Sequence, residues 1–258
     1  MPQWEDSAAA FRLDGKVAVI TGGSRGLGAA IAAGFAIAGA DVVVASRKFD
    51  NCAATAKHIA TTSGRRALPV ACHVGRWDDA EVLVDTVYRE FGRCDVLVNN
   101  AGMSPQYPDL TQVTEELYDK VHAVNARGPF RLSALFGSRM AHGDGGSIIN
   151  IGTAGALRPD SSMLPYAMAK AGMHALTLAL ADAWAPKVRA NLVMPGAFDT
   201  EAHPDADGIG ALAREFNPMQ RLGRPSDIVG PCLFLASAAG AYVNGAQLLV
   251  DGGAFRAL

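Results

Sequence analysis

The sequence has 258 residues, of which 50% are hydrophobic and 19% are charged, and its formal net charge at pH 7 is -2. The apolar fraction is sufficient for a buried core and argues against a disordered chain. The charge balance, with basic residues scattered along the chain, argues against nucleic acid or an anionic membrane as a partner.

The cysteines and histidines are spaced without a metal-binding pattern. Cys52, Cys72, Cys94 and Cys232 form no Cys-x-x-Cys pair, which predicts buried or half-buried free thiols in a reducing compartment. The six histidines form no His-x-x-x-His pair, so no metal is expected. The N-terminus lacks a signal-peptide core, and no apolar run approaches the ~18 residues of a membrane span. We therefore expect a cytoplasmic protein with residues 1–12 as an N-terminal extension.

Short runs rich in Val and Ile recur along the chain and predict buried strands. They do not alternate in polarity, which is typical of strands covered on both faces of a parallel sheet. The predicted strands are Val17–Ile20, Val42–Ala45, Val96–Val98, Ile148–Ile151, Leu192–Met194 and Leu248–Val250, with a further strand ending at Cys72-His73-Val74.

Helical spacing fills the segments between these runs. It predicts helices at residues 29–38, ended by Gly39, and at residues 78–91, ended by Gly92. A third helix is predicted from a Thr114 N-cap towards Met140. Alternating strands and helices predict right-handed β-α-β units, and hence one α/β domain (1–258) with a parallel sheet and helices on both faces.

Residues 197–221 are predicted to be an irregular insertion, because Pro204, Gly208, Gly210 and Pro218 interrupt any regular pattern there. In an open α/β sheet, an insertion after the carboxyl end of a strand lies beside the ligand crevice. We therefore expect this segment to contact the substrate.

A glycine-rich loop, TGGSRGLG, joins the first strand to the first helix. Backbone amides at a helix N-terminus bind a pyrophosphate where no side chain obstructs it. Gly22 can supply the tight turn, Gly26 the close approach and Gly28 the packing of helix on strand. The loop predicts a dinucleotide site.

The end of the second strand distinguishes between the two nicotinamide nucleotides. A site for NAD is expected to carry an acidic residue about 20 residues after the glycine loop, and here Ser46 stands at that position with Arg47 following. Arg47, with Arg25 from the glycine loop, could bind a 2′-phosphate through charge-assisted hydrogen bonds. The alternative is that both are surface arginines. This pattern favours NADP(H), with NAD(H) possible.

A Tyr-x-x-x-Lys step at Tyr166 and Lys170 can hold an ionisable phenol beside a cation, because residues four apart share a helix face. A free phenol has a pKa of about 10, and a nearby positive charge lowers it. Such a phenol usually works with a second hydroxyl that holds the substrate oxygen. Thr153, Ser161 and Ser162 are the candidates upstream.

With these motifs the sequence resembles the short-chain dehydrogenase/reductase family, in its single-domain branch. The resemblance extends from about Leu13 to Gly253 and rests on seven motifs in order: TGGSRGLG (Thr21–Gly28), NNAG (Asn99–Gly102), Asn125 in VHAVNARG, YAMAK (Tyr166–Lys170), NLVMPG (Asn191–Gly196), GRPSDI (Gly223–Ile228) and VDGG (Val250–Gly253).

The resemblance implies a Rossmann-like, doubly wound, seven-stranded parallel sheet and hydride transfer between a nicotinamide cofactor and a carbonyl or alcohol. It implies Asn125, Tyr166 and Lys170 as catalytic residues. The family's catalytic Ser lies thirteen residues before the Tyr, where this chain has Thr153. Thr keeps the hydroxyl but adds a methyl group that restricts its rotamers. Ser161 and Ser162 remain less favoured alternatives.

Together, the glycine loop and the resemblance predict a cofactor site made of residues from several turns at the strand ends. Its members are Thr21, Gly22, Ser24, Arg25, Gly26, Leu27, Gly28, Ser46, Arg47, His73, Val74, Asn100, Ala101, Gly102, Tyr166, Lys170, Pro195, Gly196, Phe198 and Thr200.

A small-molecule ketone or secondary alcohol with an apolar body is the expected substrate, because mostly apolar residues are candidates for the pocket wall. These are Met103, Leu157, Met163, Leu164, Phe198 and Phe216. A 3-oxoacyl thioester and a sugar or polyol remain alternatives, as does a catalytically impaired regulatory or scaffold protein. By resemblance, a homotetramer or homodimer is expected, and the tail after Gly253 could join its interface.

Overall fold

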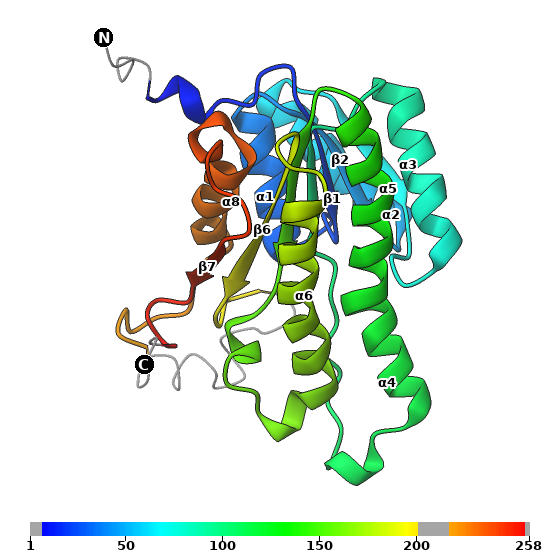
Figure 1. The fold of residues 1–258 in the computed structure, drawn as a ribbon, viewed down its shortest axis with the longest axis vertical. Coiled ribbons are helices and arrows are strands. Elements are labelled where there is room, and N and C mark those ends of the chain that lie inside the picture. The colour runs from blue at the N-terminus through cyan, green and yellow to red at the C-terminus, as the bar shows by residue number, and fades with distance from the viewer. Residues whose placement is uncertain (1–6, 201–216, 256–258) are drawn as a thin grey trace.

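Seven parallel strands form one sheet with helices on both faces (Figure 1). The structure is a computed structural model that describes residues 7–200 and 217–255. The strands are β1 (Val17–Thr21), β2 (Asp41–Ser46), β3 (Ala67–Ala71), β4 (Val96–Asn99), β5 (Gly146–Ile151), β6 (Val188–Pro195) and β7 (Gln247–Val250). They pair in the order β3-β2-β1-β4-β5-β6-β7. The predicted fold class is confirmed, and the strand order reverses between β1 and β4, where such sheets open a crevice.

The helices occupy the connections between consecutive strands. In the described residues they are α1 (Gly26–Ile37), α2 (Phe49–Ser63), α3 (Trp77–Phe91), α4 (Glu115–His122), α5 (Gly128–His142), α6 (Leu164–Ala183) and α8 (Val229–Ala236). None of the helices described is long and apolar enough to cross a membrane.

The two larger hydrophobic cores lie on opposite faces of the sheet, because adjacent residues of a strand point to opposite faces. Ala18 and Ile20 of β1 pack in the core under α1, α2 and α8, which also contains Phe35. Val17 and Val19 pack in the other core, under α3, α5 and α6, beside Phe136. Both faces are therefore buried, as the uninterrupted apolar runs predict.

The predicted helix after Thr114 consists of α4 and α5, which lie end to end in Figure 1. The Thr114 hydroxyl accepts a hydrogen bond from Leu117 N (3.1 Å), so the predicted N-cap is confirmed. A π-helical turn, Ala123–Arg127, joins the two helices. Helical spacing did not predict this turn, which inserts extra backbone at Asn125.

The third strand ends earlier than predicted. β3 stops at Ala71, and the chain leaves the sheet after Cys72 N donates to Ser46 O (2.9 Å). The backbone N–H of His73 instead donates to the Asp79 carboxylate (2.8 Å) at the start of α3. This side-chain acceptor replaces the next bond of the sheet ladder.

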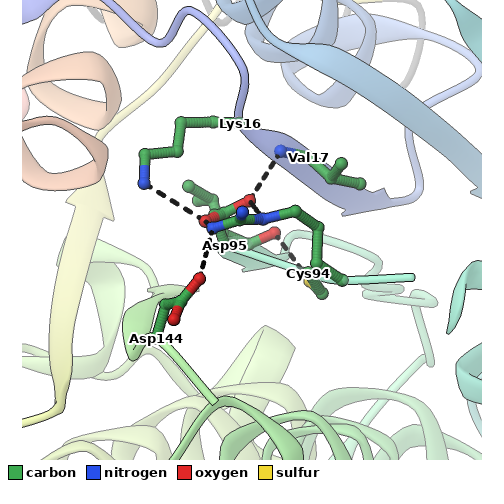
Figure 2. Close-up of polar contacts among 7 residues, drawn as sticks. Lys16, Val17, Cys94, Asp95 and Asp144 are labelled. Atoms are coloured by element: carbon green, nitrogen blue, oxygen red, sulfur yellow. Dashed lines mark hydrogen bonds and ion pairs between the residues drawn. The ribbon is translucent and has the colours of Figure 1, made fainter. Parts of the chain in front are cut away.

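A buried carboxylate joins β1 and β4 at the edge of the sheet where these strands begin (Figure 2). Asp95, 6% exposed, accepts hydrogen bonds from Val17 N (2.9 Å) and from the Arg93 guanidinium (2.5 and 2.8 Å). Lys16 Nζ lies 3.3 Å from the same carboxylate, and Asp144 pairs with Arg93 at 3.4 Å. Asp95 thus satisfies a buried backbone donor and two cations at once.

Replacing Asp95 by Ala is expected to lower the free energy of unfolding by about 2 kcal/mol, because the buried N–H of Val17 loses its acceptor. Chemical denaturation measures the change. Asp144→Ala is the matched control, since its side chain is 82% exposed and such pairs contribute little. Equal losses in the two variants would contradict this role for Asp95.

Candidate active site

The glycine loop between β1 and α1 has the conformation that its glycines predict. Gly22 (φ 64°) and Gly26 (φ 53°) lie in the left-handed region that favours glycine. A Cβ at Gly28 would lie 2.3 Å from Gly22 O, so any larger residue there would clash with the loop. No Cβ atom at these glycines therefore covers the backbone at the start of α1.

Two predicted cofactor-binding residues support this loop and do not reach the cavity. Thr21 is 1% exposed; its hydroxyl donates to Val98 O (3.2 Å) and accepts from Asn100 N and Ala101 N (both 3.1 Å). Gly28 packs against Gly22 from behind. Thr21 and Gly28 therefore support the loop from beneath its surface, and their direct contact with the cofactor stays a prediction.

A cavity of about 560 Å³ opens at the carboxyl ends of the strands. All other predicted cofactor-binding residues line it, from the glycine loop, the ends of β2, β3 and β4, α6, and the segment after β6. The segments converge because parallel strands share one carboxyl edge. Across the cavity, the side chain of Thr200 would be 3.7 Å from a Cβ at Gly26.

Arg47 lies at one end of this cavity, directly after β2. Its side chain is exposed and has no hydrogen-bond or ion-pair partner among residues 7–200 and 217–255. Arg25 lines the same cavity from the glycine loop. Both arginines and the adjacent Ser46 therefore line this end of the cavity, and none of the described lining residues there is a carboxylate.

His73 lines the cavity, and a backbone hydrogen bond orients its ring. Its Nδ1 accepts a hydrogen bond from Gly75 N (3.2 Å), which leaves Nε2 as the ring nitrogen that can donate. The half-buried imidazole thus keeps one donor available beside Val74.

Lys170 is buried on α6, one turn after Tyr166. It is 3% exposed, and its Nζ donates to Ile151 O at the end of β5 (2.6 Å). Burial lowers its pKa to about 8. The same Nζ lies 5.9 Å from the centroid of the Tyr166 ring. The ammonium is therefore held between the end of β5 and the phenol.

The phenol of Tyr166 is half-buried on the cavity wall. Burial raises its pKa, and a hydrogen bond with Thr153 opposes that rise. Burial is the largest influence on this pKa in the structure. The phenol therefore holds its proton at neutral pH. The lowering that we expect from the Lys170 ammonium together with the oxidised nicotinamide ring stays a prediction.

Thr153 is the hydroxyl that the fold brings to Tyr166. It follows β5, its Oγ1 accepts from Gly155 N (3.2 Å), and its hydroxyl is hydrogen-bonded with the Tyr166 phenol. Ser161 and Ser162 are exposed in the turn before α6 and do not line the cavity. Among the three candidate hydroxyls, only Thr153 has the strand-end position.

Asn125 lies in the π-helical turn, fully buried behind the cavity wall. Its side-chain amide donates to Met103 O (2.8 Å) and Val121 O (2.9 Å) and accepts from Met103 N (3.2 Å). A Cβ at Gly102 would lie 3.0 Å from Asn125 Oδ1 and 3.6 Å from Lys170 Nζ. The Asn125 side chain thus fixes the backbone that follows β4 close to Lys170.

The pocket wall beside Thr153 and Tyr166 differs partly from the expectation. Met103, Met163 and Phe198 line the cavity, whereas Leu157 is 54% exposed and Leu164 lies off the wall. Phe216 and residues 201–216 of the predicted insertion lie outside the described residues. Leu157 follows the 3-10 turn Ala154–Ala156 and Leu164 is the first residue of α6, so both wrong assignments lie in the segment between β5 and the first turn of α6, whose direction depends on tertiary packing.

Further residues line the cavity without having been predicted, among them Cys72, Ser104 and Phe255. Phe255 comes from the tail that we expected at a subunit interface. Asp251 after β7 turns this tail back, because its carboxylate accepts from Gly253 N (2.9 Å) and Phe255 N (2.8 Å). An Asp-Gly-Gly sequence signals such a turn, but not where it leads.

The thiols of all four cysteines are free and buried, as predicted. Burial raises the pKa of the Cys72 thiol to about 12. Within the described residues, no group of three or more His, Cys, Asp or Glu side chains could hold a metal ion.

Comparison with known proteins places this site in a family. A model of the family described as enoyl-(acyl carrier protein) reductase matches residues 22–254. The chain is 39% identical to an uncharacterized oxidoreductase of Mycobacterium tuberculosis, over 94% of this chain and 93% of that protein. It is 34% identical to a D-threitol dehydrogenase of Mycolicibacterium smegmatis, over 94% of each.

A solved structure resembles this one over its whole length. It is a gluconate 5-dehydrogenase from Burkholderia cenocepacia in complex with NADP and tartrate, with a TM-score of 0.91 and 31% identity. The alignment covers 98% of this chain and all of that one (100%). The chain belongs to the short-chain dehydrogenase/reductase family of oxidoreductases.

Proposed function

We propose that the protein is an NADP(H)-dependent oxidoreductase that interconverts a ketone and a secondary alcohol, with Tyr166 as the general acid and base. The observation that carries this proposal is the grouping of Tyr166, Thr153 and Lys170 on one cavity with the glycine loop. A proton donor, an oxyanion donor and a dinucleotide cradle are thereby within one space.

The residues of the cavity suit NADP(H). The glycine loop offers backbone donors for a pyrophosphate at the start of α1, and Arg47 and Arg25 face the region after β2 where a 2′-phosphate would be neutralised. The gluconate 5-dehydrogenase with the similar fold contains NADP. When bound, the cofactor supplies or accepts the hydride.

Residues of the chain would transfer the proton and stabilise the charge that develops. In ketone reduction, Tyr166 donates its phenolic proton to the carbonyl oxygen while Thr153 donates a hydrogen bond to the same oxygen. Lys170, with a pKa of about 8, is mostly an ammonium at neutral pH and stabilises the phenolate that remains. Asn125 contributes through the backbone of Met103, which it holds in place.

The substrate proposed is an uncharged ketone or secondary alcohol with an apolar body. Met103, Met163, Phe198 and Phe255 supply apolar wall, and Ser104 adds a polar group. A polyol is the second candidate, because one relative is a D-threitol dehydrogenase. A 3-oxoacyl thioester is the third, because the matching family model is described as an acyl-carrier-protein reductase.

Absorbance of the reduced cofactor tests the reaction directly. Mixing the protein with NADPH and a panel of apolar ketones, keto-sugars and 3-oxoacyl thioesters should consume NADPH with at least one class. Tight NADPH binding without turnover of any ketone would instead favour a scaffold or regulatory protein. The cytoplasmic location and the homotetramer stay predictions, for which cell fractionation and light scattering are the direct tests.

Replacing Arg47 by Asp is expected to weaken NADPH binding about 10- to 100-fold, since a charge-assisted hydrogen bond contributes about 1.5–3 kcal/mol. NADH binding should not weaken, because NADH lacks the 2′-phosphate. Fluorescence titration gives both dissociation constants. Lys48→Asp is the matched control, as it makes the same charge change at the next residue, off the cavity wall. Equal loss of NADPH and NADH affinity would contradict the assignment.

A further inference from the structure

The start of α6 lacks a cap from its own flanking sequence. The helix begins at Leu164, and Met163 at the N-cap position makes no side-chain hydrogen bond to it. The first N–H groups of a helix have no partner within the helix, so an external acceptor stabilises them. This end of α6 matters because Tyr166 is the third residue of the helix.

The Tyr107 side chain supplies that acceptor from a distant part of the chain. Its hydroxyl accepts a hydrogen bond from Leu164 N (2.8 Å) and donates one to Ser161 O (2.5 Å). A phenol has one proton to donate and lone pairs to accept, so both ends of the turn before α6 are bound by one atom. Tyr107 lies in the segment after β4 that also carries Met103 and Ser104 of the cavity wall.

The Tyr107 ring also packs behind Tyr166. Both tyrosines, with Met163 and Pro165, line a small apolar space that Leu117 and Val121 of α4 close. Met163 and Tyr166 line this space and the large cavity as well. Tyr107 therefore supports the wall of the candidate active site from its outer side.

We propose that Tyr107 is a positioning residue that sets the location of the Tyr166 phenol by capping α6. The inference rests on the proposed function, in which Tyr166 must meet Thr153 and a substrate oxygen together. Leu164 N is two residues from Tyr166, so a shift of this first turn moves the phenol directly. A misplacement of about 1 Å can lower a rate about 10²-fold.

Tyr107→Phe removes the hydroxyl and keeps the ring. We expect kcat for ketone reduction to fall about 10-fold, with the dissociation constant for NADPH unchanged, since Tyr107 lies off the cofactor cavity. The pH profile of alcohol oxidation should also move to higher pH, because a displaced phenol loses the hydrogen bond with Thr153 that lowers its pKa. A merely structural residue would leave that profile in place.

Amide hydrogen exchange provides a readout that does not depend on turnover. In Tyr107→Phe, exchange of the Leu164 N–H should be faster, because it loses its acceptor, and exchange in α1 should be unchanged. Tyr242→Phe is the matched control, because the Tyr242 side chain is fully exposed. Unchanged exchange at the start of α6, or an unchanged kcat and pH profile, would overturn the proposal. If the wild type reduces no carbonyl compound, the proposed function fails, and exchange alone then decides whether Tyr107 caps α6.

Discussion

Replacement of Tyr166 by Phe is expected to lower kcat for ketone reduction about 10³-fold, because a positioned proton donor contributes about 10²- to 10⁴-fold. Phe keeps the aromatic ring that packs beside Met163 and Pro165 but has no proton to transfer. Binding of NADPH and the melting temperature should stay close to wild type. Stopped-flow absorbance of NADPH gives the rate of the chemical step.

The pH dependence gives the same prediction a second readout. Burial raises the pKa of Tyr166, so the proton needed for reduction is present at neutral pH and is lost only as the pH rises through that raised value. Alcohol oxidation needs the phenolate and should therefore accelerate with rising pH. In Tyr166→Phe this ionisation disappears from both profiles. A variant with wild-type kcat and an unaltered profile would remove Tyr166 from the mechanism.

Replacement of Thr153 by Val is expected to lower kcat about 10²-fold, which is the typical cost of losing one oxyanion donor. Val matches the shape of Thr but has no hydroxyl. The change also removes the acceptor for Gly155 N, and the loss of such a cap costs about 1 kcal/mol. Rates should therefore be measured well below the melting temperature of the variant.

Thr153→Ser is the matched comparison, because it keeps the hydroxyl and removes only the methyl group. Activity at or above the wild-type level is expected, since the branched side chain of Thr has fewer accessible rotamers. Normal turnover by Thr153→Val would refute the oxyanion role. An equal loss of kcat in the Val and Ser variants would also contradict that role, because Thr153→Ser keeps the hydroxyl.

Local patterns in the sequence were sufficient to predict much of the architecture. Unalternating runs such as Val17–Ile20 predict strands buried on both faces, and both hydrophobic cores use those residues. Thr114, followed by Glu-Glu-Leu, predicts an N-cap from the local sequence, and the structure contains it. These signals are strong because backbone geometry and burial act between residues close in the chain.

The ends of the strands and helices, and the residues of the cavity wall, were harder to predict from the sequence. The strand before His73 ends early because Asp79, six residues away, offers a competing acceptor. The π-helical turn around Asn125 depends on the side-chain bonds to Met103 O and Val121 O. Leu157 is exposed and Phe255 lines the cavity, because each lies in a turn whose direction is set by distant packing.

The sequence by itself determined the α/β sheet, the glycine loop and the presence of Tyr166 and Lys170 on one face of a helix, because each follows from short-range periodicity or spacing. Only the tertiary structure decided that Thr153 meets the Tyr166 phenol, that Thr21 supports the loop from below, and that Tyr107 caps α6. Those contacts join segments far apart in the chain. Their geometry depends on how the whole sheet and its helices pack, which no local pattern contains.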